Sequence, residues 1–200
     1  MLKTETKQFQ YEIQSYQEDC VNNIISLFES LRQKVDFVEV LTAHHKKNKY
    51  NFPVQDTKNI DIMMETGTGK TFTFIKTIFE LSNHFGYKKF IVLIPTVPIR
   101  EGTKTNFEDT KDYFTSFYAN EREKEIETFV YEGGNISAVR QFIGTSHLSV
   151  LVMTPSSFNS KDNILNRPLE REINQPDLFF NNEEPPKSYL ECLKRLNPIV

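Results

Sequence analysis

The sequence predicts an α/β fold, in which a parallel sheet is flanked by helices. Two short, continuous apolar runs, 89–95 and 149–153, are typical of strands that are buried on both faces of a parallel sheet. A third apolar run, 60–64, precedes a glycine-rich turn and a helical pattern that extends to about Asn83. Strand, helix and strand are therefore expected to form a βαβ unit within the first half of the chain.

Composition excludes several classes of protein. The 200 residues suit one large domain or one and a half small ones, and 24 basic against 27 acidic residues give a net charge of −3. No global positive field indicates nucleic-acid binding, although a local basic groove remains compatible with DNA. Cys20 and Cys192 lie far apart, which favours a reducing cytoplasm over a disulfide framework. The sequence shows no secretory signal, no membrane span and no histidine spacing typical of zinc.

The N-terminal region predicts one amphipathic helix. Apolar residues from Tyr16 to Leu31 repeat at helical spacing, so we expect a helix over 15–33, with Ser15 as its N-cap. Gln17 falls in the first turn, where its amide offers one donor and one acceptor to an adenine edge. An exposed helical glutamine is the alternative, and the residues alone favour it.

Residues 35–58 give a weaker pattern. The segment 35–41 is compatible with a short strand or with an extension of the first helix, and a polar, basic loop is expected after it. Lys46, Lys47 and Lys49 stand beside Tyr50 and Phe52, which suits contact with a phosphate backbone. A solvated loop is the alternative, and it is favoured.

The most specific motif is the phosphate-binding loop that precedes the second helix. Thr66, Gly67, Thr68 and Gly69 form a turn whose glycines let the backbone approach a phosphate closely. Its backbone N–H groups and the helix N-terminus then face the anion. Lys70 reaches the β- and γ-phosphates, and the Thr71 hydroxyl ligates Mg²⁺. The strict pattern has a further glycine at the position of Met64, so the match is incomplete.

A second candidate site follows the apolar run 89–95. Loops at the carboxyl ends of parallel strands bind ligands in open α/β folds. Thr96, Arg100, Thr103 and Lys104 are suited to phosphate contacts, whereas an ordinary connection with a salt-bridging arginine is an equal alternative. Two prolines are expected to prevent a helix from starting before Ile99.

The remaining elements alternate along the chain. We expect strands at 128–132 and 149–153 and helices at 106–118, 136–145 and 187–196, with a turn at 133–135, a long surface loop at 159–186 and the start of another strand at 197–200. The candidate buried residues of the helix 106–118 are all aromatic: Phe107, Tyr113, Phe114 and Phe117. Gly86 is expected to end the helix of the phosphate-binding loop, and Thr154 follows the last predicted core strand.

Two motifs carry a family resemblance. M-E-T-G-T-G-K-T at 64–71 resembles motif I of superfamily 2 helicases, and I-P-T-V-P-I-R-E-G at 94–102 resembles their motif Ia. The second motif is similar in particular to the restriction (Res) subunit of type III restriction–modification enzymes. S-Y-Q at 15–17 stands where that family has its adenine-contacting glutamine, which favours a functional Gln17. Thr154 and Pro155 stand near motif Ib.

The resemblance implies a RecA-like lobe that binds ATP and Mg²⁺ through Gln17 and through 66–71, with Lys70 and Thr71 as catalytic residues. It implies a division into 1–58, with the glutamine motif and the basic loop, and 59–200, with the partial lobe. Thr96, Arg100 and Thr154 would contact the DNA backbone. The whole enzyme would be an ATP-dependent translocase and endonuclease of the cytoplasm, acting on double-stranded DNA with a methyltransferase (Mod) subunit and without a membrane.

The chain departs from the family in extent. No Asp-Glu pair follows an apolar strand, and the second motor lobe and a nuclease motif are not found. We therefore expect a fragment or a truncated product that ends before motif II. Such a chain binds ATP weakly and scarcely hydrolyses it, since hydrolysis also needs a carboxylate and an arginine finger. The alternatives are a fragment of another superfamily 2 motor, such as a type I restriction subunit or a repair helicase, and a non-hydrolysing remnant.

Overall fold

The computed structural model describes residues 11–33, 36–54, 59–118, 126–134, 136–159, 164–166, 169 and 186–200. The chain divides into two compact units, which we name the helical unit, Gln10–Phe85, and the sheet unit, Gly86–Val200. The division at residue 58 that the motifs imply is a different one and stays a prediction.

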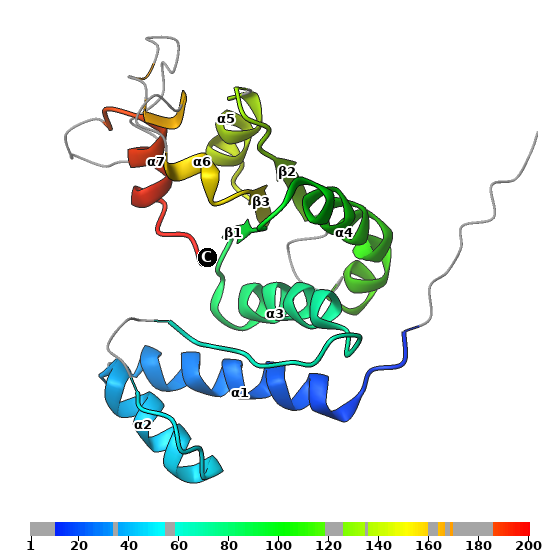
Figure 1. Cartoon of the computed structure of the whole chain (residues 1–200), viewed down its shortest axis with the longest axis vertical. Helices are drawn as coiled ribbons and strands as arrows, with labels where there is room; N and C mark the ends of the chain where they lie inside the picture. The colour runs from blue at the N-terminus through cyan, green and yellow to red at the C-terminus, as the bar shows by residue number, and fades with distance from the viewer. Residues whose placement is uncertain are drawn as a thin grey trace, which may run out of the picture. The chain divides into compact units, whose positions relative to one another are not determined.

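The helical unit contains three helices, α1 (Ser15–Arg32), α2 (Phe37–Asn48) and α3 (Lys70–Phe85). Helix α1 packs against both α2 and α3 (Figure 1). Phe28 of α1 and Phe85 of α3 have ring centroids 5.9 Å apart. A smaller apolar cluster of Leu27, Val40 and Leu41 joins α1 to α2. Gly86 follows α3 with a φ of +74°, which confirms the predicted glycine end of this helix.

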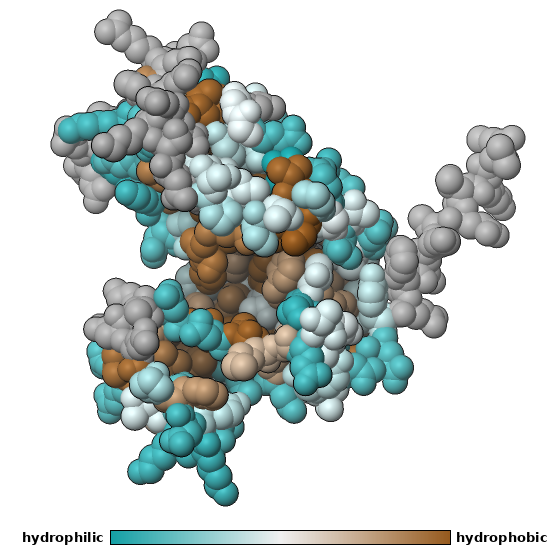
Figure 2. Space-filling view, in the orientation of Figure 1, coloured by the Kyte–Doolittle hydropathy of each residue, from teal (hydrophilic) through white to brown (hydrophobic). Residues whose placement is uncertain are grey.

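Helix α2 replaces the strand or helix extension, and most of the basic loop, that the sequence predicts for this region. Asp36 begins the helix, because its side chain accepts hydrogen bonds from the backbone N–H groups of Val38 and Glu39, at 3.0 and 3.1 Å. The helix continues through the basic residues to Asn48. Hydrophilic side chains cover its end (Figure 2). The sequence-based interpretation overlooked an N-cap, Asp36, that was visible in the sequence.

The predicted strand at 60–64 is wrong. Residues 59–65 form neither helix nor strand in the structure, and Ile62 and Met63 are 50% and 88% exposed. Ile60 instead packs against the apolar cluster between α1 and α2. A strand forms only where a neighbour completes its hydrogen bonds, and no described strand pairs with this segment. The expected βαβ unit therefore lacks its first strand.

The sheet unit is built on three parallel strands, β1 (Lys89–Leu93), β2 (Glu127–Val130) and β3 (Ser149–Met153), in the order β1-β3-β2. Leu93 pairs with Met153, and Val130 pairs with Val152. Every residue of the central strand β3 is buried, as its continuous apolar sequence predicts. The parallel sheet flanked by helices confirms the predicted α/β class.

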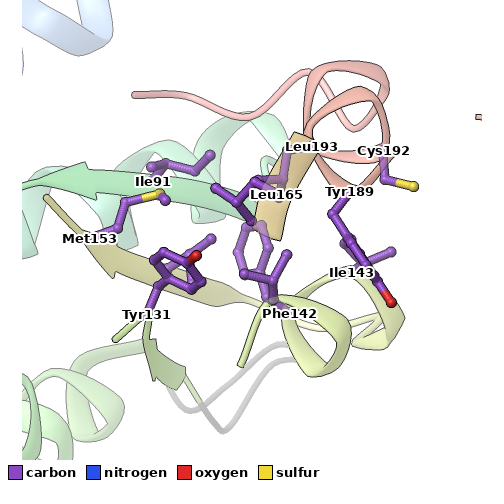
Figure 3. Packing of buried hydrophobic residues seen from close by; sticks show 11 residues of the cluster. Ile91, Tyr131, Phe142, Ile143, Met153, Leu165, Tyr189, Cys192 and Leu193 are labelled. Carbon is purple, nitrogen blue, oxygen red and sulfur yellow. The ribbon is translucent and has the colours of Figure 1, made fainter. Parts of the chain in front are cut away.

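Helices pack around this sheet. They are α4 (Val97–Tyr118), α5 (Ser137–Gly144), the short α6 (Ser156–Asn159), the 3₁₀ turn η1 (Ile164–Asn166) and α7 (Tyr189–Arg195). Side chains from α5 and α7 meet those of the strands in one apolar core, where Tyr131, Phe142 and Met153 are almost fully buried (Figure 3). Burial of such side chains stabilises the fold by about 1.5–3 kcal/mol each.

Three predicted details of the helices are wrong. Helix α4 starts at Val97, well before the predicted start at 106 and before Ile99, because Pro98 lies in the first turn, where a missing N–H costs no helical hydrogen bond. Phe107 and Phe114 are buried as predicted, but Phe117 is 62% exposed. Gln14, rather than Ser15, is the N-cap of α1.

The other elements agree with the sequence. Helices α5 and α7 and strands β2 and β3 lie within three residues of their predicted bounds. Ile199 forms an isolated parallel bridge with Phe90, which agrees with the start of a strand near the end of the chain, although Asn197 has a φ of +47° and is not extended. Most of the loop predicted at 159–186 lies outside the described residues. Among the described helices, none has the length and apolar character to cross a membrane.

Candidate nucleotide-binding site

The glycine loop leads directly into α3. Gly67 and Gly69 have φ values of +83° and +82°, a region that other residues rarely adopt. Between them, the Thr68 hydroxyl donates a hydrogen bond of 2.7 Å to the Glu65 carbonyl, which closes the turn. Because Lys70 begins α3, the loop ends at a helix N-terminus, where unpaired N–H groups and the helix dipole favour an anion.

The side chain of Lys70 folds back onto the loop. Its ammonium group donates to the carbonyl oxygens of Met64 and Glu65, at 3.1 and 2.8 Å. These contacts direct the ammonium group onto the loop, while Lys70 remains exposed to solvent. Thr71, the next residue, is half-buried in the first turn of α3.

Gln17 of α1 contacts the glycine loop. Its side-chain Nε2 donates to the Thr68 carbonyl at 2.9 Å, and its Oε1 accepts from the Gln14 backbone N–H at 3.2 Å. Gln17 is only 6% exposed, so it is not the solvated glutamine that the residues alone favour. A Cβ built on Gly69 would lie 2.4 Å from Nε2, so the amide fills the space that glycine leaves. The structure thus brings Gln17 and the loop together.

Two residues of this region were missed from the sequence. Thr73 is 2% exposed and donates through its hydroxyl to the Gly69 carbonyl at 3.2 Å, which fixes the end of the loop to α3. The sequence did offer a signal, because a threonine four residues after Gly69 in a helix can donate its hydroxyl to the Gly69 carbonyl. Tyr11, whose ring centroid lies 5.1 Å from that of Phe72, gave no local signal.

The residues present fit a nucleoside triphosphate with Mg²⁺. The phosphates are anionic, and the loop offers backbone N–H groups, a helix N-terminus and the Lys70 ammonium. Because Gly69 has no Cβ, its backbone lies next to the side-chain amide of Gln17. That amide can form further hydrogen bonds with a ligand. Thr71 would hold the metal through its hydroxyl, and Lys70 would hold the phosphates.

The candidate DNA-binding residues lie in the sheet unit. Because Leu93 pairs with Met153, Thr96 and Thr154 both follow the carboxyl ends of adjacent strands. Thr96 is exposed at the start of α4, and its carbonyl accepts from the Arg100 N–H at 3.0 Å. The Thr154 hydroxyl lies 2.8 Å from that of Ser156 and 3.3 Å from that of Ser157.

Arg100 is buried in a polar cluster. Its guanidinium donates to Glu101 Oε1 at 2.9 Å, to Glu132 Oε1 at 3.3 Å and to the Tyr131 carbonyl at 3.2 Å. The side chain of Arg100 is 9% exposed, while those of Glu101 and Glu132 are 51% and 64% exposed. The salt-bridging alternative therefore describes Arg100 in this structure, where it joins α4 to the segment after β2.

Comparison with known proteins identifies the family. The family model "Type III restriction enzyme, res subunit" matches residues 10–184. The EcoPI Res subunit of Escherichia phage P1 is 33% identical over 171 residues, which is 74% of this chain and 17% of that protein. The EcoP15I Res subunit of Escherichia coli is 36% identical over 132 residues, which is 58% and 13%.

The StyLTI Res subunit of Salmonella typhimurium is 34% identical over 111 residues, which is 54% of this chain and 11% of that protein. No solved structure matches the chain significantly. The chain spans less than a fifth of the length of these three relatives. The family match covers most of the chain and includes the glycine loop, Gln17 and the sheet-edge threonines. The chain belongs to the family of type III restriction enzyme Res subunits.

Proposed function

We propose that this chain is the ATP-binding part of the DNA translocase subunit of a type III restriction–modification endonuclease. The observation that supports this most directly is the hydrogen bond between Gln17 and the loop residue Thr68. It joins a candidate adenine contact to a candidate phosphate site within one compact unit. The relatives are restriction–modification enzymes by name, which supports a Mod methyltransferase and double-stranded DNA as partners.

The amide of Gln17 suits adenine. Nε2 carries two N–H groups, and one donates to Thr68; Oε1 carries two lone pairs, and one accepts from Gln14. One donor and one acceptor remain. A bidentate pair between such an amide and adenine is worth about 1–3 kcal/mol of base discrimination.

Lys70 and Thr71 serve the phosphates. Lys70 would exchange the carbonyls of Met64 and Glu65 for the β- and γ-phosphates, so that charged acceptors would replace two neutral ones. Thr71 would hold Mg²⁺ through its hydroxyl. ATP, when bound, supplies the free energy of phosphoryl transfer that a translocase uses.

At the sheet edge, the Thr96 and Thr154 hydroxyls are the proposed contacts to the DNA backbone. Arg100 would join them only by leaving Glu101 and Glu132. The stability and the DNA affinity of Arg100→Leu separate these two roles.

Calorimetric titration with ATP and Mg²⁺ tests the nucleotide site. The parent chain is expected to bind, and Lys70→Ala is expected to weaken binding by about tenfold or more, since hydrogen bonds to charged groups are worth about 1.5–3 kcal/mol. Lys76→Ala is the matched control, because Lys76 lies on the same helix and pairs with Glu80 at 3.4 Å. Equal binding by all three proteins would contradict the proposal.

A further inference from the structure

A basic turn closes α2 and lies outside both sites described above. We name residues 44–52 the α2 turn. Lys46, Lys47 and Lys49 are exposed there, and the sequence holds no acidic residue between Glu39 and Asp56. Within the described part of the chain, none of the three lysines forms an ion pair with a carboxylate. In a chain of net charge −3, this is a local concentration of positive charge.

The backbone of the α2 turn is fixed by hydrogen bonds. The Lys49 N–H donates to the Lys46 carbonyl at 3.3 Å, and the Tyr50 N–H donates to the His45 carbonyl at 2.9 Å. Lys49 has φ +57° and ψ +32°, so it occupies the left-handed position that usually takes glycine. His45 Nδ1 lies 3.1 Å from the Phe52 carbonyl and fixes the next residues. The backbone from which the exposed lysines project therefore has a defined conformation.

Two aromatic side chains project beside these lysines. Tyr50 is 48% exposed and Phe52 is 65% exposed. The Tyr50 ring contacts His45 edge to face, with centroids 5.8 Å apart. Exposed aromatic rings next to unpaired cations are the combination by which proteins contact nucleic-acid strands, with cations on phosphates and rings on sugars and bases.

The helix dipole explains only part of this arrangement. Basic side chains in the last turn of a helix are stabilised by the negative C-terminal end, which accounts for Lys46 and Lys47. It does not account for a lysine in the left-handed position, or for an exposed phenylalanine three residues later. Desolvation lowers the pKa of His44 most, and the charges of His45 and Lys47 lower it further; only this second effect reflects positive charge around the turn.

We propose that the α2 turn is a DNA-binding site, in which Lys46, Lys47 and Lys49 bind backbone phosphates and the rings of Tyr50 and Phe52 lie against the strand. This site rests on the DNA-binding part of the proposed function and adds to it a contact from the helical unit. It does not depend on nucleotide binding, because none of its residues belongs to the glycine loop.

Fluorescence anisotropy with a labelled oligonucleotide tests the site. The 200-residue chain is titrated into a duplex and into a single strand of equal length, over a range of salt concentrations. The test variant carries Lys46→Gln, Lys47→Gln and Lys49→Gly, since glycine suits the left-handed position and keeps the turn. The matched control carries Lys88→Gln, Lys187→Gln and Lys194→Gln, the same change of charge at exposed positions of the sheet unit.

The test variant is expected to lower the slope of log affinity against log salt by about three, because each lost phosphate contact removes about one released counterion. The control variant is expected to keep the slope of the parent. The form of DNA for which the slope falls, duplex or single strand, is the form that the turn binds. ATP binding by calorimetry is expected to be unchanged in the test variant, so a failure of the nucleotide site would be recognised separately.

Three results would overturn the proposal. The first is a parent chain that does not bind DNA, and the second is a test variant whose slope equals that of the control. The third is a polyglutamate peptide that binds the parent as tightly as DNA does and loses binding through the same lysines. That result would assign the α2 turn to an acidic protein surface instead.

Discussion

The side-chain Nε2 of Gln17 lies 2.9 Å from the Thr68 carbonyl and 2.4 Å from where a Cβ on residue 69 would stand. Gln17 and Gly69 are therefore complementary, since the amide occupies space that only glycine leaves. This relationship places the first turn of α1 against the glycine loop, and it gives the loop a partner whose removal can be measured.

Alanine at the two loop glycines tests that relationship. Gly67 and Gly69 have nearly equal φ values, but nothing lies within 4 Å of a Cβ on Gly67. Both substitutions are expected to lower the free energy of unfolding by about 1–2 kcal/mol through backbone strain. Gly69→Ala is expected to lower it by about 1 kcal/mol more, because Gln17 loses its bond to Thr68.

Urea unfolding measures the free energy of unfolding of both variants. Each substitution is made once in the parent chain and once in a chain that also carries Gln17→Ala. In that background the two alanine substitutions should cost the same. A difference that survives the removal of Gln17 would show that another contact distinguishes the two glycines.

Thr71 is expected to make ATP binding depend on Mg²⁺. Thr71→Val keeps the shape of the side chain and removes the hydroxyl, so the gain in affinity that Mg²⁺ gives the parent should be lost. Thr71→Ser should restore it, because serine keeps the oxygen. Calorimetry with and without Mg²⁺ measures the gain, and a valine variant with the full gain would refute the assigned role.

Arg100 is expected to stabilise the sheet unit. Arg100→Leu leaves the Tyr131 carbonyl without this donor, which costs about 1–3 kcal/mol; the exposed carboxylates of Glu101 and Glu132 add little. Thr96→Ala, at an exposed position nearby, should leave stability unchanged. Thermal unfolding compares the two variants. A stable Arg100→Leu protein with weakened DNA binding would instead favour the direct DNA contact.

Stability is expected to depend on pH through Lys89. Burial lowers its pKa from 10.5 to about 8, against the opposing effect of Glu127, while its ammonium donates to the carbonyls of Phe142 and Thr145 and to Ser149. Between about pH 8 and 10.5 the unfolded chain binds the proton more tightly, so this group makes stability rise with pH. Relative to Lys89→Met, the parent should gain stability across that window. If the unfolding midpoint of the parent minus that of Lys89→Met stays constant or falls as the pH rises, the effect is excluded.

The sheet was predictable because its signals are local and continuous. The five residues of β3 are all apolar or small, and all are buried. Strand β1 was equally clear from its sequence, and Gly86 marked the end of α3 before it. These features depend on residues that are neighbours in the chain, so the pattern alone identifies them.

Pairing partners were not predictable in the same way. The apolar run at 60–64 has the composition of a strand, but its place depends on which distant segment completes its hydrogen bonds, and Ile60 packs on helices instead. Helix α2 was missed because its last turns are basic and polar, although Asp36 supplies a clear N-cap. Pro98 was weighed as a helix breaker, whereas the first helical turn tolerates it.

The loop residues of the candidate site were predictable, and their contacts were not. The motif identifies Gly67, Gly69 and Lys70 by spacing. The bond from Gln17 to Thr68 spans 51 positions, so no local pattern indicates it, and only the family resemblance pointed to Gln17. The burial of Arg100 between two carboxylates likewise depends on Glu132, 32 positions away.

The ratio of ATP to GTP affinity in the parent chain and in Gln17→Ala tests the central claim most directly. If the remaining donor and acceptor of Gln17 contact adenine, the parent should prefer ATP by about 5–150-fold, the equivalent of 1–3 kcal/mol. In Gln17→Ala that preference should fall close to one. A ratio that is the same in both proteins would contradict the claim that Gln17 and the glycine loop form one adenine-nucleotide site.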